Sequence, residues 1–540
     1  MNRTKSPAAE TDSNAGPIQT TGDDMTILID RRSVLALGGA VGLAALMRGH
    51  GAFAAGAEQI TILQSEAPRS MDPADQTATY TAALLAPMYE SLTGYNEKME
   101  IVPALATRWE TDATGTVWTF TLRQGVKFHD GEPCNVDAVI ASFARHMDEK
   151  RGLAASGRFR AVLAEVKAEG TDAVRFTLKK PYPAFLKLMA VVSASIVSPK
   201  ADKAGTLGRA AVGTGPYKLA EYKSGEYVLE EVNADYWGEK APTKTLKWIW
   251  TQEAAVMNMA VQTGDADIVV PLPPVFATPV KSNPELALIE GNPTSVFWVA
   301  LNCKLAPLDD VRVRQALNFA TDRAGLVSNL LYGFGQPATS PLSPAVFGYD
   351  PTVEGYGFDI AKAKALLAEA GHADGITINV AVQEPEANIA EILQGMWAQA
   401  GITLNIQRME SGVWTAAAFG TPEEKAAQGV HSVIASWATG TYDADLQLKP
   451  LYYTDSWSPK SANLGFYSNP ELDKLLDEGG SSTDDAKRKE AYAKAQRIIV
   501  QDAAHVLLYY PNDLAAARAD VKGAWLQPGG QIEPVTATKG

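Results

Sequence analysis

Helices and strands alternate through the second half of the chain, and this alternation restricts the fold more than any other feature. Apolar residues on one face predict a helix over 361–370, which stops at Gly371, followed by a strand over 376–382. A second helix over 389–400 and a second strand over 402–406 follow. Strand-helix-strand units of this kind build a parallel or mixed sheet. We therefore expect an α/β fold.

Residues 118–148 predict a strand, a turn and an amphipathic helix. Apolar and polar residues alternate from Trp118 to Leu122, which is the period of a half-buried strand. Asp130-Gly131 predicts a turn, and Asn135 can cap a helix that starts at the next residue. Another helix is predicted over 79–92. These patterns predict helices, strands and turns. By themselves they do not indicate a catalytic or binding site.

The same stretch, WTFTLRQGVKFHDGEPCNVDAVIASFARHMD, closely resembles the signature of the extracellular solute-binding proteins of ABC importers, family 5, the peptide/nickel class. Residues 213–217, GTGPY, and residues 309–323 resemble further segments of that family. The resemblance implies a periplasmic-binding-protein-like fold of type II, in which two α/β lobes close on a ligand. It also implies the function of such a protein, which captures a peptide or a small polar solute and delivers it to an inner-membrane permease.

The resemblance further implies where the lobes lie in the chain. Lobe one is expected at 58–289 plus 508–540, with an extra subdomain at about 89–210, and lobe two at 290–507. Two strands that cross between the lobes are expected to form a hinge. The mature protein is expected to be a monomer.

Residues 1–57 are predicted to comprise a disordered segment and an export signal. Residues 1–29 are polar, whereas Arg31-Arg32 precede an apolar run, LALGGAVGLAALM, that is short and Gly-rich for a membrane span. This pattern is typical of a twin-arginine signal, with cleavage near Ala54 or Ala57. We expect the twin-arginine export machinery as a partner and a periplasmic mature protein; an uncleaved membrane anchor is the alternative.

The overall composition is that of a soluble protein that does not bind nucleic acid. The chain of 540 residues is 46% hydrophobic and 20% charged, and its net charge is −14. An acidic chain favours solubility and argues against a nucleic-acid partner. Cys134 and Cys303 are the only cysteines, and either one disulfide or two free thiols would fit the sequence.

The sequence contains no complete catalytic or metal-binding motif. HExxH and GxSxG are absent, and GTGPY lacks the ending of a phosphate-binding loop, which favours a tight backbone turn there. His129 with Glu132, and His146 with Glu149, have a spacing that could be a metal fragment, but His129 is expected to stabilise a turn. We expect a binding protein without a cofactor or metal. Two alternatives stay open, an exported α/β hydrolase and a carrier of a nickel or other metal complex.

The resemblance also suggests which residues contact the ligand. Dipeptide-binding relatives hold the peptide carboxylate with an Arg and the amino terminus with an Asp, and these positions fall at Glu384 and Gly440 here. Because like charges repel in a desolvated cleft, we expect no ordinary dipeptide binding and a preference of Glu384 for an amine, a guanidinium or a hydroxyl-rich ligand. The alternative is that the match to the relatives slips by a residue or two, or that Glu384 points to solvent. Aromatic residues near the matched segments complete the set. The expected ligand contacts are Glu66, Tyr80, Trp298, Glu384, Trp414, Trp437, Gly440, Tyr442 and Asp443.

Overall fold

The computed structural model describes residues 59–540. The predictions about the export signal and its cleavage concern residues outside this range. Within it, no helix has the length and apolar character needed to cross a membrane.

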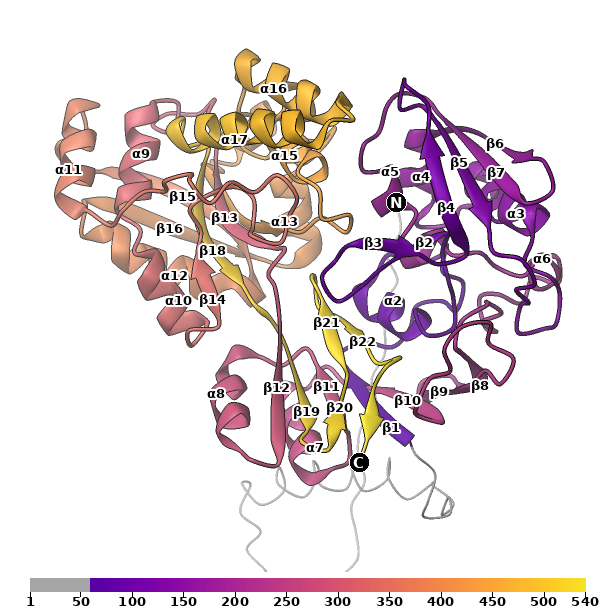
Figure 1. Cartoon of the computed structure of the whole chain (residues 1–540). Coiled ribbons are helices and arrows are strands. Elements are labelled where there is room, and N and C mark those ends of the chain that lie inside the picture. Colours follow the sequence, from indigo (N-terminus) through magenta and orange to yellow (C-terminus); the bar gives the residue numbers. More distant parts are fainter. Residues whose placement is uncertain (1–58) are drawn as a thin grey trace, which may run out of the picture. The chain divides into compact units, whose positions relative to one another are not determined.

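The first large sheet is mixed and has seven strands, in the order β12-β19-β11-β1-β10-β9-β8 (Figure 1). Its central strand β1 pairs in parallel with β10 and β11, whereas the outer strands pair antiparallel. The strands are β1 (Gln59–Gln64), β8 (Tyr217–Lys223), β9 (Tyr227–Val232), β10 (Thr245–Trp250), β11 (Ile268–Val270), β12 (Leu286–Gly291) and β19 (Asp513–Arg518). We call this sheet and the elements packed on it the first lobe.

The second large sheet has six strands, in the order β14-β18-β13-β17-β15-β16, and forms the second lobe. They are β13 (Val296–Leu301), β14 (Gly335–Pro337), β15 (Ile376–Gln383), β16 (Ile402–Met409), β17 (Ser432–Trp437) and β18 (His505–Pro511). Strand β15 runs parallel to β16 and to β17, with α11 (Ile360–Glu369) before it and α12 (Ala387–Ala398) after it. The predicted alternation of helices and strands is therefore confirmed.

A smaller antiparallel sheet, in the order β4-β5-β7-β6, carries its own core, and we call it with its helices the subdomain. Its strands are β4 (Ala106–Thr111), β5 (Val117–Leu122), β6 (Leu163–Glu169) and β7 (Ala173–Leu178). Phe120, Phe143 and Phe176 meet edge to face within this core. As predicted, the Asn135 side chain accepts a hydrogen bond from the Ala138 N–H and caps α3 (Val136–Met147).

The remaining elements surround these three sheets. The helices are α2 (Thr79–Leu85), α4 (Ser156–Val162), α5 (Phe185–Leu188), α6 (Pro199–Lys203), α7 (Ala254–Thr263), α8 (Pro274–Ser282), α9 (Val311–Phe319), α10 (Arg323–Leu330), α13 (Ser411–Ala418), α14 (Pro422–Ala427), α15 (Asp445–Tyr452), α16 (Pro470–Ser481) and α17 (Asp485–Gln501). The short strands are β2 (Thr93–Tyr95), β3 (Ile101–Pro103), β20 (Val521–Lys522), β21 (Trp525–Gln527), β22 (Gln531–Glu533) and β23 (Thr538–Lys539).

Helix α2 is shorter than the sequence predicts, because the chain after it packs against the GTGPY loop. The backbone carbonyls of Pro87 and Met88 accept hydrogen bonds from that loop. A Cβ at Gly213 would lie 2.2 Å from the Met88 oxygen, and one at Gly215 would lie 2.4 Å from the Pro87 oxygen. The glycines of this loop therefore permit a close approach of two backbones, and neither needs a left-handed conformation.

The chain passes between the two large sheets twice. Residues 292–295 connect β12 to β13, and Asn512 alone connects β18 to β19, which follow one another in Figure 1. This topology is that of a two-lobe binding protein with two crossing strands, as expected. The exact lobe boundaries, and the hinge motion itself, stay predictions.

A ligand cavity between two lobes

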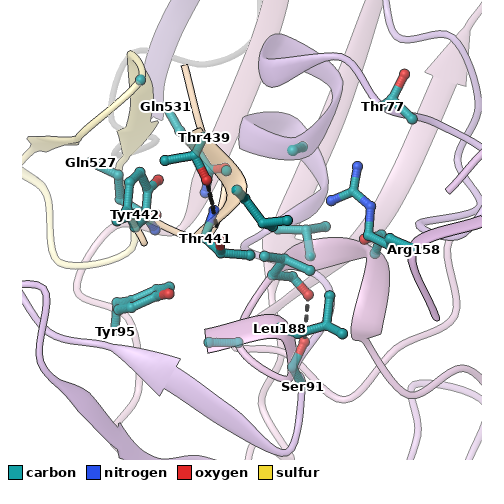
Figure 2. A pocket seen from close by; sticks show the side chains of 18 of the residues that line it. Thr77, Ser91, Tyr95, Arg158, Leu188, Thr439, Thr441, Tyr442, Gln527 and Gln531 are labelled. Carbon is teal, nitrogen blue, oxygen red and sulfur yellow. Dashed lines mark hydrogen bonds between the residues drawn. The ribbon is translucent and has the colours of Figure 1, made fainter. Parts of the chain in front are cut away.

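A cavity of about 870 Å³ is lined by residues from both lobes, from the subdomain and from the hairpin β21–β22 (Figure 2). The second lobe contributes Thr439 and Thr441, the subdomain side contributes Leu188, and the hairpin contributes Gln527 and Gln531. A volume of this size falls within the range of about 300–1,000 Å³ that is usual for small-molecule sites. The lining combines apolar surface with hydroxyl and amide groups, which suits a polar solute.

The second lobe reaches the cavity through the loop that follows β17, and Tyr442 holds that loop in place. The Tyr442 hydroxyl donates to the Pro528 carbonyl oxygen at 2.7 Å, and its ring meets the edge of Tyr95, with 5.7 Å between centroids. Its φ of 52° is uncommon for a residue other than glycine, and such conformations persist only where surrounding contacts fix them. The loop is therefore fixed by contacts with the first lobe.

The residue after Tyr442 in this loop takes part in a buried ion pair. Asp443 is fully buried and accepts from the Arg488 guanidinium at 2.6 Å. From the subdomain, Lys187 Nζ donates to the Tyr442 carbonyl oxygen at 3.0 Å and lies 3.4 Å from Asp443 Oδ2. Burial lowers the pKa of the Lys187 ammonium, and Asp443 offsets this in part. These bonds join the subdomain to the second lobe.

Two carboxylates line the cavity on the first-lobe side. Glu90 accepts hydrogen bonds from Thr214, Tyr236 and Trp237, each at 2.8 Å, although burial still raises its pKa. Glu533 accepts from the amides of both hairpin glutamines, each at 2.6 Å, and burial raises its pKa to about 7. Glu90 is thus held by three donors of the protein itself.

Comparison with known proteins identifies what kind of molecule carries this cavity. Residues 100–459 match the family model of bacterial extracellular solute-binding proteins, family 5 (middle region). The chain belongs to this family. It is 28% identical over 495 residues to the glutathione-binding protein GsiB of Escherichia coli K12, covering 91% of this chain and 96% of the relative.

Solved structures agree with this assignment. HbpA2 from Haemophilus parasuis superposes with a TM-score of 0.81 at 26% identity, over 89% of this chain and 100% of that one. A dipeptide binding protein from Pseudoalteromonas sp. SM9913, solved with Met-Leu, gives a TM-score of 0.73 at 26% identity over the same shares. This family 5 protein is accordingly the solute-binding component of an ABC importer and not an enzyme, as expected from the signature.

Of the residues expected to contact ligand, three line the cavity of this family 5 protein. Trp437, Gly440 and Tyr442 belong to β17 and the loop after it. Asp443 belongs to the same loop but not to the cavity lining, and its carboxylate is bound by Arg488 and Lys187. The structure brings these four residues together, and contact with a ligand stays a prediction for each.

The other expected contacts lie outside the cavity lining. Trp298 and Trp414 belong to the core of the second lobe, and Trp298 stacks on the His505 ring at 4.4 Å. Glu66 pairs with Arg69 at 3.6 Å, and Tyr80 packs beside the first-lobe core.

Glu384 also lies outside the lining. It is 65% exposed and lies 3.2 Å from Arg408, so the structure favours the alternative in which it points to solvent.

The histidines with metal-like spacing have structural partners. His129 Nδ1 accepts from the Gly213 N–H at 3.3 Å, and Nε2 lies 3.1 Å from the Gly215 oxygen, so the ring binds the GTGPY loop. The His146 ring is held by Ser156 and by the Ser193 carbonyl, each at 3.0 Å. Both cysteines are free thiols, which decides the alternative left open by the sequence.

Several cavity residues were not found by sequence reasoning. Arg158 lies on the short helix α4, and Gln527, Gln531 and Glu533 lie on a hairpin near the C-terminus. The hairpin strands have only three residues each, too few for a periodic pattern. No sequence signal marks these residues, because the fold alone brings them to the cavity.

Proposed function

We propose that this family 5 protein captures a short peptide or peptide-like zwitterion in the cavity and delivers it to the membrane permease of its importer. The observation that carries the proposal is the cavity itself, about 870 Å³ in volume and lined by hydroxyl, amide and charged groups from both lobes. The relatives support it, because GsiB is named for glutathione and the Pseudoalteromonas structure holds Met-Leu.

Isothermal titration calorimetry with glutathione, trialanine and Met-Leu tests this proposal. A ligand that binds only the native state also raises the apparent melting temperature, which gives an independent reading. We expect micromolar or tighter binding of glutathione or of trialanine, and weaker binding of Met-Leu. Absence of binding for all three peptides would overturn the proposal.

The sequence supports a further proposal about location. We infer that the mature protein works as a monomer in the periplasm, after export by the twin-arginine machinery and cleavage near Ala54 or Ala57. The support is the Arg31-Arg32 pair before an apolar run, together with a relative described as a periplasmic binding protein. Replacement of both arginines by lysine should leave precursor in the cytoplasm, and unchanged export would contradict this route.

A further inference from the structure

Arg158 differs from the arginines near it in having no acidic partner. Arg145 and Arg151 both bind Asp202, at 2.8 and 2.6 Å, and Arg160 lies 3.9 Å from a glutamate. Within residues 59–540, no carboxylate oxygen lies within 4.0 Å of the Arg158 guanidinium, and no side chain or backbone group accepts a hydrogen bond from it. Its five N–H donors are thus left for something that the protein itself does not supply.

The unpaired charge of Arg158 lies where a ligand can reach it. The residue lines the cavity, and burial lowers the pKa of its guanidinium, with a small opposing effect from Tyr182. Lys180 also faces the cavity, but Asp445 and Asp477 attract its charge. The side chain is nevertheless exposed, so its N–H donors are open to the cavity, where an anionic group of a ligand could form charge-assisted hydrogen bonds with them.

An acidic group occupies the opposite side of the cavity. Figure 2 shows Arg158 across the cavity from Gln527 and Gln531, whose amides both donate to Glu533 Oε1 at 2.6 Å. The second oxygen, Oε2, accepts no hydrogen bond from any residue in the described part of the chain. Two donors thus fix the carboxylate, and one oxygen stays available for a cation.

Asp445 fits the role of a cation-binding acid less well. Its Oδ1 is buried without a hydrogen-bond partner, but Lys449, Arg488 and Lys180 already place positive charge near its carboxylate. Asp445 is therefore less in need of a ligand ammonium than Glu533.

We propose that Arg158 and Glu533 are the two charged anchors of the site: Arg158 binds a carboxylate of the peptide-like ligand and Glu533 binds its amino group. This inference rests on the proposed function and deepens it, because it assigns the ends of the ligand. Both anchors differ from Glu384 and Gly440, the positions suggested by dipeptide-binding relatives. They lie on the subdomain and on the first-lobe hairpin, so the ligand is held by its ends before the second lobe covers its middle with Thr439 and Thr441.

Calorimetry with chemically matched ligands tests the assignment. Glutathione and trialanine are each titrated in three forms: unmodified, as the C-terminal amide, and with an acetylated amino group. The variants are Arg158→Gln and Glu533→Gln. Their matched controls are Arg160→Gln, on the same helix but outside the cavity, and Glu285→Gln, on the first-lobe surface.

We expect Arg158→Gln to weaken the unmodified peptide about 10–100-fold, the worth of one charge-assisted hydrogen-bonded pair, and to leave the C-terminal amide unchanged. Glu533→Gln should weaken the unmodified peptide and leave the N-acetyl form unchanged. Both control variants should bind like the unmodified protein. The unmodified protein should itself lose affinity for both modified peptides, which tests the assignment even where a variant fails to fold.

The outcomes separate the two proposals. If no peptide binds to the unmodified protein, the proposed function fails and the anchors fail with it. If peptides bind but each variant loses equal affinity for all three forms, or loses none, the proposed function stands and the assignment of the anchors is overturned.

Discussion

A single buried glutamate is the clearest destabilising residue in the first lobe. Glu230 on β9 is fully buried between Leu219 and Leu246 of the neighbouring strands, and neither carboxylate oxygen has a hydrogen-bond partner in residues 59–540. Burial raises its pKa well above the usual value, and the nearby Trp248 indole offsets this only in part. The unfolded chain therefore ionises more readily than the folded one.

This pKa shift sets the direction of a stability prediction. Because the folded pKa lies above the unfolded one, stability should fall as pH rises from the unfolded pKa towards the folded one. Glu230→Met should raise the free energy of unfolding by about 1–3 kcal/mol at pH 8, and by less at pH 5. Urea denaturation at pH 8 and at pH 5 measures the change in the free energy of unfolding. A Met variant that is less stable at pH 8 would contradict the account.

Two tryptophans that the sequence treats alike should behave differently. Trp298→Ala opens a cavity in the second-lobe core and should cost about 3–5 kcal/mol of stability, with ligand affinity nearly unchanged in the folded fraction. Trp437→Ala should instead weaken ligand binding, because Trp437 lines the cavity. Thermal melts and calorimetry on both variants separate the effects, and the reverse pattern would show that our placement of the two rings is mistaken.

The sequence could not separate these tryptophans. In a strand covered on one side, alternate residues show which face is buried, but β13 lies in a sheet with a core on each face. Trp298 belongs to one core and Val299 to the other. Every position of β13 is therefore apolar, and nothing in the pattern indicates which aromatic residue faces a cavity. Glu384 was assigned to the site only by comparison with dipeptide-binding relatives, and such a comparison does not show where a side chain points.

At the scale of elements, Lys187 on α5 connects the subdomain to the second-lobe loop. Lys187→Met removes this connection but leaves Asp443 paired with Arg488. One net hydrogen bond is worth about 1 kcal/mol, so we expect about fivefold weaker binding through faster ligand release. Stopped-flow measurement of the release rate of the bound peptide, glutathione or trialanine, tests this expectation. Lys200→Met, on a more exposed lysine of α6, is the control.

An unchanged release rate in Lys187→Met would mean that the connection does not hold the lobes together. An equal effect in the Lys200 control would point instead to a general loss of positive charge.

Most elements could be predicted from the sequence, for reasons that are local. Asn135 caps α3 because its side chain reaches an N–H three residues ahead, and α12 shows its apolar face in its own spacing. Helix α2 was predicted too long, since its end depends on contacts with a loop more than a hundred residues away. The cavity hairpin was missed for the same reason, because distant packing determines its place.

At the scale of the whole molecule, the two connections near Thr294 and Asn512 are the only passages between the large sheets in residues 59–540. A ligand that contacts both lobes should favour the arrangement in which they approach. Small-angle scattering should therefore show a smaller radius of gyration with saturating peptide than without it. An equal radius in both states would count against closure around these connections.

The proposed occupant of the cavity is a peptide-like zwitterion. Mass spectrometry of the protein purified from the periplasm without denaturation, followed by release of its ligand, tests that claim most directly. We expect close to one molecule per chain of a compound with a free carboxylate and a free amino group, and less of it on Arg158→Gln. Recovery of an uncharged compound, such as a neutral sugar, at the same stoichiometry would show that the cavity does not select a zwitterion.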